Sequence, residues 1–132
     1  MRFRKESRAD AADLNHAAYA RGCELYDSGE YSQALAAFRE ATSYWPEDPD
    51  AWMAIANCYD SLRRPKQAEK VLRKALDLGK EKIRDALLYN LGNSLYDQGR
   101  FEEAIAVYES LPPGTEIWES AQLNAARARK RT

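Results

Sequence analysis

Side chains that could bind a metal or act as nucleophiles are few and widely spaced in this chain of 132 residues. The two cysteines, Cys23 and Cys58, lie 35 positions apart without a Cys-x-x-Cys pair, and His16 is the single histidine. Structural zinc sites take four cysteine or histidine ligands at short spacing, so the sequence predicts no metal site. Cysteines outside a disulfide framework are typical of a reducing compartment, and we expect a cytoplasmic protein.

Two pairs of adjacent carboxylates, Glu47–Asp48 and Glu102–Glu103, could in principle divide acid and base roles between them. Both pairs stand where a helix is predicted to begin, and acidic residues there cap free N–H groups and complement the helix dipole. The chain also lacks a glycine-rich phosphate loop, and nothing next to Cys23 in the sequence would activate its thiol. We therefore predict no enzymatic activity and no cofactor.

Charge is unevenly distributed along the chain. The net charge is −1, and residues 1–8 and 127–132 each hold four basic side chains, which leaves 12 basic and 20 acidic ones between them. An acidic body repels phosphate backbones, so we expect no nucleic acid partner. The basic C-terminal residues complement a helix dipole, with polyanion binding as the alternative. No stretch reaches the roughly 18 apolar residues of a membrane span, and no apolar stretch follows the basic N-terminus as in a secretory signal.

Small residues recur along the chain at a nearly constant spacing. The spacing is 34 residues and then 36 in two separate series, which are Gly22, Ala56 and Gly92, and Ala34, Ala68 and Ala104. A period of this length predicts a helical repeat with a two-residue insertion near 79–84. Small residues allow two helices to cross closely, because a large side chain there would force the axes apart.

The elements that carry this repeat are predicted to be helices. Apolar residues recur at helical spacing between turn residues such as Gly29 and Gly99, which can take a positive φ, and Pro46 ends a helix that Asp48 or Asp50 can follow as a cap. The expected helices cover residues 12–28, 31–44, 49–61, 65–78, 82–98, 101–110 and 115–130. The last has no partner helix, so we interpret 115–130 as a cap over the apolar end of the stack.

Taken together, these motifs resemble the tetratricopeptide repeat, a helix–turn–helix unit of 34 residues. The likeness is carried by Leu91-Gly92-Asn93 and Phe101-Glu102-Glu103-Ala104-Ile105 in the third unit, by Trp52 in the second, and by the residues from Gly22 onward in the first. Ala18, Arg21 and Lys80 depart from the family pattern. The resemblance implies an all-α helical-hairpin solenoid, a right-handed superhelix of about seven helices. Its parts would be a basic N-terminal segment and helix start at 1–14, repeats at 15–48, 49–84 (with the insertion) and 85–114, and a capping helix with a basic tail at 115–132.

The resemblance also implies a concave groove lined by the first helix of each repeat. The residues at the groove-facing positions are predicted to bind a peptide and are Tyr19, Cys23, Tyr26, Asp27, Met53, Asn57, Asp60, Tyr89, Asn90, Asn93, Tyr96 and Asp97. Tyrosines offer rigid contact area, and asparagines can pair with a peptide backbone. Asp27, Asp60 and Asp97 occupy equivalent places on one edge and would favour basic residues on the ligand.

Tetratricopeptide domains that hold the C-terminal carboxylate of heat-shock chaperones share a clamp of lysines, asparagines and an arginine. The corresponding positions here contain no cation and hold Tyr19, Cys23, Ala54, Ala86 and Asn90. We therefore expect a different ligand. The function predicted is a non-enzymatic protein-interaction module, adaptor or chaperone-like, that binds a peptide segment of another protein. The alternative is a self-assembling scaffold, a homo-oligomer joined through solenoid ends that carry Phe3 and Leu14.

Overall fold

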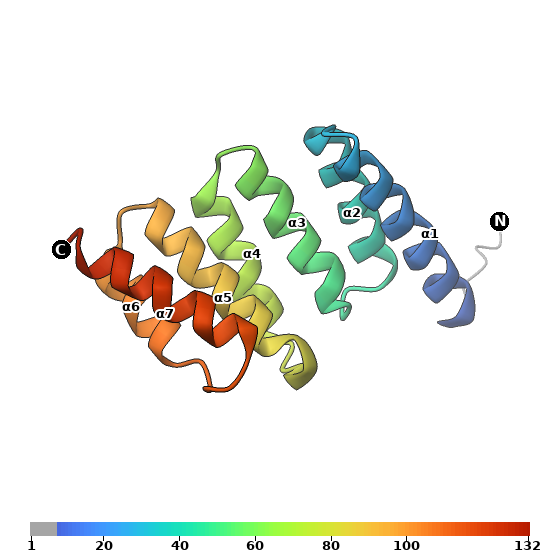
Figure 1. Ribbon diagram of the computed structural model, residues 1–132. Helices are drawn as coiled ribbons and strands as arrows, with labels where there is room; N and C mark the ends of the chain where they lie inside the picture. The colour runs from blue at the N-terminus through green and yellow to red at the C-terminus, as the bar shows by residue number, and fades with distance from the viewer. Residues whose placement is uncertain (1–7) are drawn as a thin grey trace, which may run out of the picture.

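The structure, a computed structural model, describes residues 8–132, and Phe3 lies outside this part of the chain. Within it the chain forms seven helices and no strand (Figure 1). They are α1 (Arg8–Asp27), α2 (Tyr31–Tyr44), α3 (Pro49–Ser61), α4 (Pro65–Asp77), α5 (Glu81–Asp97), α6 (Phe101–Glu109) and α7 (Glu116–Arg129). The all-α fold predicted from the sequence is confirmed. None of these helices is long and apolar enough to cross a membrane.

The helices form two layers. Each helix packs on the next one along the chain, and α5 also contacts both α3 and α7. Figure 1 shows α1, α3, α5 and α7 side by side in one layer, with α2, α4 and α6 behind them. The first layer is called the inner layer below, and the second is called the outer layer. The capping helix α7 therefore continues the inner layer and covers α5 and α6.

The helix pairs approach closely because of small residues at their crossings. A Cβ added to Gly22 would lie 2.5 Å from the Phe38 ring, and one added to Gly92 would lie 2.4 Å from the Tyr108 ring. Neither distance is sterically possible, so each aromatic ring occupies the volume that a side chain would take. The repeat alanines of the outer helices are also fully buried. The recurring small residues are thus a packing requirement, as the sequence predicts.

The turns inside the three hairpins use one conformation. Gly29 and Gly99 have φ of 78° and 77°, and Arg63 holds the equivalent place in the second repeat with φ 63°. Only glycine adopts this region without steric cost, so the second hairpin carries some backbone strain.

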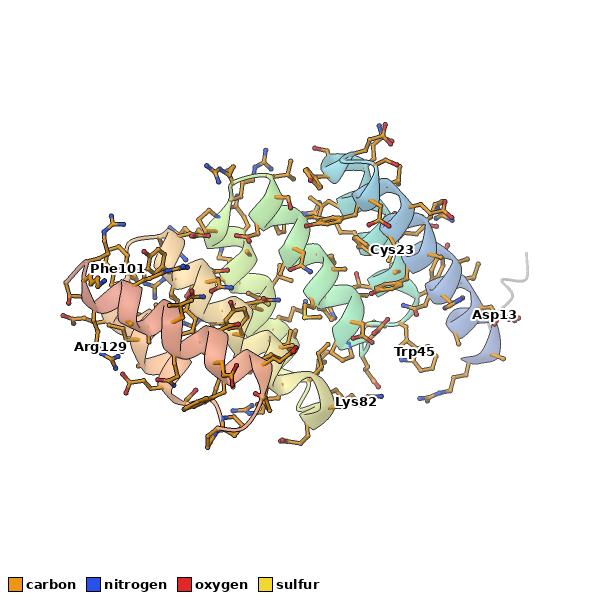
Figure 2. The ribbon with its side chains drawn as sticks, viewed as in Figure 1. Asp13, Cys23, Trp45, Lys82, Phe101 and Arg129 are labelled. Carbon is orange, nitrogen blue, oxygen red and sulfur yellow. The ribbon has the colours of Figure 1, made fainter. Side chains whose placement is uncertain are left out.

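Most helix ends lie within a residue or two of their predicted positions, and the exception is the start of α1. This helix begins at Arg8 rather than near residue 12. The guanidinium of Arg8 lies 4.8 Å from the ring centre of Trp45, which follows α2 (Figure 2). A contact across this sequence distance stabilises the added turn and cannot be found from local helical pattern.

Candidate protein-binding groove

The inner layer brings the predicted groove residues to one surface. All of them are half-buried or exposed, and none is a fully buried core residue. They lie on α1, α3 and α5, because equivalent positions of successive repeats present the same face of each inner helix. Eight of them line two neighbouring hollows, while Met53, Tyr89, Tyr96 and Asp97 lie outside both. Their role in binding stays a prediction.

The first hollow lies between α1 and α3 and is called the α1–α3 hollow. It has a volume of about 130 Å³ and is lined by Tyr19, Cys23, Tyr26, Asp27, Phe38, Ala54 and Asn57. Its lining is mainly aromatic, and its polar groups are the Asp27 carboxylate, the Asn57 amide, two tyrosine hydroxyls and the Cys23 thiol. Figure 2 shows Cys23 on α1. α1 makes no contact with α3 comparable to that between α3 and α5, which leaves this space open.

The second hollow, the α3–α5 hollow, is smaller, at about 10 Å³, and more polar. It is lined by Ala56, Asn57, Asp60, Leu72, Asn90, Asn93 and Ser94. Because Asn57 borders both hollows, the two form one strip along the inner layer. Three amide side chains, those of Asn57, Asn90 and Asn93, lie within this strip. Asn57 and Asn90 offer both a donor and an acceptor to an extended backbone.

The groove tyrosines are held in place by rings on the outer side of each hairpin. In the first repeat Tyr19 packs on Phe38 with ring centres 5.4 Å apart, and in the third repeat Tyr89 packs on Tyr108 at 6.1 Å. A second pair per repeat, Tyr26–Tyr31 and Tyr96–Phe101, has ring centres 5.0 and 5.1 Å apart. Each groove tyrosine therefore uses part of its ring in packing, which pre-organises the part that remains at the surface.

The C-terminal end of the groove is occupied by the protein itself. The Asn93 Oδ1 atom accepts hydrogen bonds from the Tyr108 hydroxyl at 2.6 Å and from the Asn124 amide of α7 at 3.2 Å. The same Asn124 amide donates to the Tyr89 hydroxyl at 3.1 Å. Asn124 is absent from the sequence prediction. The sequence feature that could have pointed to Asn124 is its place beside Ala125, on the helix predicted to cap the stack.

Negative charge collects at the C-terminal ends of the inner helices. Asp27 ends α1, Asp97 ends α5, Asp60 is next to the end of α3, and none of these helices has a basic residue in its last turn. Among the described residues, the Asp27 carboxylate has no ion-pair or hydrogen-bond partner. Partial burial and the neighbouring Asp60 raise the pKa of Asp97, while Arg63 acts in the opposite direction.

Two titratable side chains of the inner helices have raised pKa values. Burial, followed by the nearby Cys23, raises the pKa of the Cys58 thiol to about 11, so this thiol stays protonated at neutral pH. Burial is the main cause that raises the pKa of Tyr19 to about 12, and the nearby Cys23, Asp50 and Asp48 raise it further by electrostatic repulsion. Over residues 8–132 no group of three His, Cys, Asp or Glu side chains could hold a metal ion.

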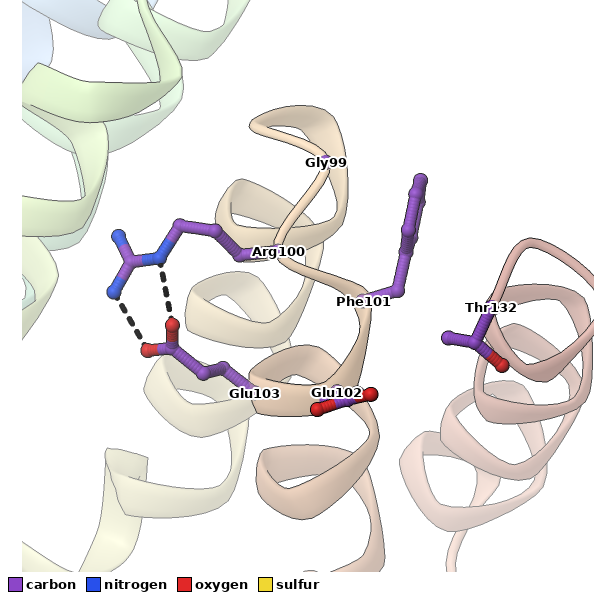
Figure 3. A pocket seen from close by; sticks show the side chains of 6 residues that line it. All are labelled: Gly99, Arg100, Phe101, Glu102, Glu103 and Thr132. Carbon is purple, nitrogen blue, oxygen red and sulfur yellow. Dashed lines mark hydrogen bonds and ion pairs between the residues drawn. The ribbon is translucent and has the colours of Figure 1, made fainter.

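A larger hollow, of about 340 Å³, lies outside the groove at the turn between α5 and α6 (Figure 3). Its Arg100 and Glu103 side chains are paired with each other at 2.6 and 3.0 Å, as the dashed lines in Figure 3 show. Arg131 covers the Phe101 ring at 5.1 Å. Arg100, Glu103 and Arg131 therefore already have partners within the chain, while the Glu102 carboxylate that also lines this hollow has none among the described residues.

The same arginine joins the second and third repeats. Arg100 also donates to Glu69 of α4 at 2.6 Å, beside Arg73 at 2.9 Å and Gln98 at 3.0 Å. Burial alone would raise the pKa of Glu69, but the hydrogen bonds from Gln98, Arg73 and Arg100 hold it below its ordinary value. This cluster explains the buried carboxylate as a structural link between repeats.

Antiparallel helical hairpins with small residues at each crossing, stacked so that equivalent faces line one surface, define a helical-repeat protein. The tetratricopeptide repeat family model matches residues 19–85 and 63–116, which together are most of the chain. The chain belongs to the tetratricopeptide repeat family.

Individual relatives agree with this assignment. The chain is 37% identical over 83 residues to the type IV pilus assembly protein PilF of Pseudomonas aeruginosa, a match that covers 63% of this chain and 32% of that protein. It thus spans about a third of the curated relative. The Arabidopsis OM64 tetratricopeptide domain superposes with a TM-score of 0.81 at 19% identity, covering 92% of this chain and 99% of that one. The first such domain of Spaghetti (RPAP3), bound to an HSP90 peptide, gives 0.80 at 18% identity, with 90% and 93% covered.

Proposed function

We propose that this chain is a non-enzymatic interaction module, an adaptor or chaperone-like protein, that binds an extended segment of a partner protein along its inner layer. The observation that carries the proposal is the continuous strip of two hollows that share Asn57. Aromatic walls, surface amides and an unpaired carboxylate are the groups that recognise a peptide rather than react with it.

The relatives support a protein ligand for this chain, but the groove residues do not fit the heat-shock peptide that one of these relatives binds. The Spaghetti domain is described with the HSP90 peptide SRMEEVD, whose last four residues hold three carboxylate side chains and the C-terminus. Here the positions that correspond to the clamp hold Tyr19, Cys23, Ala54, Ala86 and Asn90, and none of these side chains is a cation. An acidic groove edge would instead repel it. A partner segment with basic residues fits these charges, and the likeness to a protein named for pilus assembly is consistent with a protein partner.

A direct test uses peptides chosen by the protein itself. Random peptides displayed on phage are selected on the full chain, and one selected peptide is titrated into ¹⁵N-labelled protein. We expect shifts at amides of α1, α3 and α5, and we expect Asn57→Ala to weaken binding several-fold. Gln67→Ala, an exposed amide on the outer helix α4, is the matched control and should bind normally. Shifts confined to α2, α4 and α6, or no selectable peptide at all, would refute the groove.

Self-assembly through the end of the stack is the second candidate. Leu123 on the capping helix α7 is an exposed large apolar side chain, with 55% of its surface accessible. Sedimentation velocity over a wide concentration range separates the two functions, since the scaffold must form oligomers that Leu123→Gln dissociates. A chain that stays monomeric throughout would leave the peptide groove as the function.

A further inference from the structure

We propose that the α1–α3 hollow is an anchor site for one lysine or arginine side chain of the partner segment, an inference that rests on the proposed groove function. The hollow combines apolar walls with a single carboxylate at its edge, and this combination matches a side chain with an aliphatic stem and a cationic tip.

The walls suit the stem. Tyr19, Phe38 and Ala54 are among the lining residues, and the volume of about 130 Å³ is of the size of one extended side chain rather than of a bulky ligand. Tyr19 packs on Phe38, so the wall is rigid before a ligand arrives. Aromatic rings also attract a cation through their faces, which favours a side chain with a cationic tip over a neutral one.

The charges around the hollow favour a cationic group at the end of the ligand side chain. Asp27 lines the hollow without a partner among the described residues, while Asp48 and Asp50 contribute negative potential at Tyr19. The cations of the adjoining helices are already engaged: Arg21 of α1 pairs with Glu40 at 2.6 Å, and Arg39 of α2 donates to the Tyr59 hydroxyl. Helix α3 contains no basic residue. No cation from these three helices therefore competes with one supplied by a ligand.

The C-terminus of α1 adds to the negative potential beside the hollow. A helix C-terminus carries partial negative charge and is stabilised by cations, yet α1 ends in Asp27 with no basic residue in its last turn. Lys74 stands in the last turn of α4, and Arg127 and Arg129 stand in that of α7, whereas the last turns of the other helices hold no basic residue. The α1 end is thus left electrostatically unfavourable, and a cation bound beside Asp27 would correct it.

The test uses two small probes that differ by one charge. Acetyl-Gly-Lys-Gly-amide and its norleucine counterpart are titrated separately into the ¹⁵N-labelled full chain at millimolar concentration. We expect saturable shifts at Tyr26, Asp27 and Asn57 with the lysine probe, and binding at least about threefold weaker with norleucine, which keeps the stem but loses the charge. High salt should reduce the difference.

Matched variants assign the effect to one carboxylate. Asp27→Asn should bring the two probes to equal affinity, and because it removes an acid from a helix C-terminus it should not unfold the protein. Asp77→Asn removes the same charge from the end of the outer helix α4 and should leave the preference for lysine intact. Equal affinities for the two probes in the unmodified chain, or absence of saturable shifts in the hollow, would overturn the anchor.

The failure of the anchor is distinguishable from that of the groove. Each basic residue of a phage-selected peptide is replaced by norleucine, and the groove shifts are measured again. If the peptide still occupies α1, α3 and α5 with unchanged affinity after every replacement, the anchor is wrong and the groove function stands. If neither the probes nor the selected peptides shift inner-layer amides, both are wrong.

Discussion

Two junctions of the inner layer are built from the same repeat positions and have opposite character. At the first, between α1 and α3, Cys23 and Ala54 face an open hollow of about 130 Å³. At the last, between α5 and α7, Asn93 is the counterpart of Cys23 and is bonded to Asn124 and Tyr108. The α1–α3 junction leaves surface accessible to a ligand, while the α5–α7 junction is closed by the chain's own capping helix.

The difference shows that a position in the repeat does not by itself define a binding residue. Tyr19 and Tyr89 stand at equivalent places and pack on equivalent rings, yet Tyr19 lines the α1–α3 hollow and Tyr89 lies outside both hollows of the groove. What differs is the next inner helix. Asn124 of α7 bonds to Tyr89 of α5, whereas α3 bonds to α1 through Ser61 and Tyr26 at 2.8 Å and leaves Tyr19 beside an open hollow. The N-terminal half of the groove is therefore the better candidate for a ligand.

The largest expected effect is that of Ala68→Glu, which should disrupt both junctions at once. Ala68 on α4 is 1% exposed, and Ala68→Glu would bury an unpaired carboxylate at a helix crossing, a destabilisation of roughly 3–5 kcal/mol. Because each repeat packs only on its neighbours, loss of the middle one should uncouple both ends. Thermal unfolding followed by circular dichroism measures the effect. Lys70→Glu, an exposed change on the same helix, should stay within about 0.5 kcal/mol, and a normal melt for Ala68→Glu would contradict the assigned crossing.

Smaller losses of stability are expected from single substitutions that distinguish the closed junction from the open one. Asn124→Ala removes the donor to Asn93 and Tyr89 and should lower the free energy of unfolding by about 1–2 kcal/mol. Asn57→Ala, at the open junction, should change it by less than about 0.5 kcal/mol, since no hydrogen bond of the Asn57 side chain is found within residues 8–132. Urea unfolding measures both values. Equal losses would mean that the open junction is packed as tightly as the closed one.

Sequence reasoning succeeded where the determinants are local and periodic. The spacing of Gly22, Ala56 and Gly92 predicts close helix crossings, and the rings found against the two glycines explain that spacing. Turn glycines and the Asp48 cap, which accepts a hydrogen bond from the Asp50 amide at 3.0 Å, are equally local and were predicted. These features give the all-α fold and the face that each inner helix presents.

The parts that escaped prediction depend on contacts between segments distant in sequence. Asn124 reaches Tyr89 from 35 positions away, and no local pattern reports that the capping helix would close one end of the groove. The start of α1 depends in the same way on Arg8 and Trp45. The choice of open and closed junctions is set by the distance between helix axes, which follows from packing across whole repeats rather than from any single residue.

The smallest expected effect concerns the acidic edge between these junctions. The folded-state pKa of Asp97 is raised by partial burial and by Asp60, so the folded chain holds this proton more tightly than the unfolded chain does. The protonated Asp97 therefore stabilises the fold at acidic pH. This stabilisation is lost as the pH rises from the unfolded-state pKa of Asp97 through its higher folded-state pKa. Because the side chain is exposed, we expect Asp97→Asn to be more stable than the unmodified chain at pH 7 by only a few tenths of a kcal/mol.

This difference should close as the pH falls through the same interval, since protonation then gives Asp97 the neutral form that the asparagine always has. Taking the difference between two chains at each pH cancels the titration of all other groups, and urea unfolding at a series of pH values supplies it. Asp60→Asn removes the acidic neighbour and should shrink the effect of Asp97→Asn. If the difference instead widens at low pH, Asp97 is stabilised in its charged form, and our proposal of a basic partner would then lose its support at this end of the acidic edge.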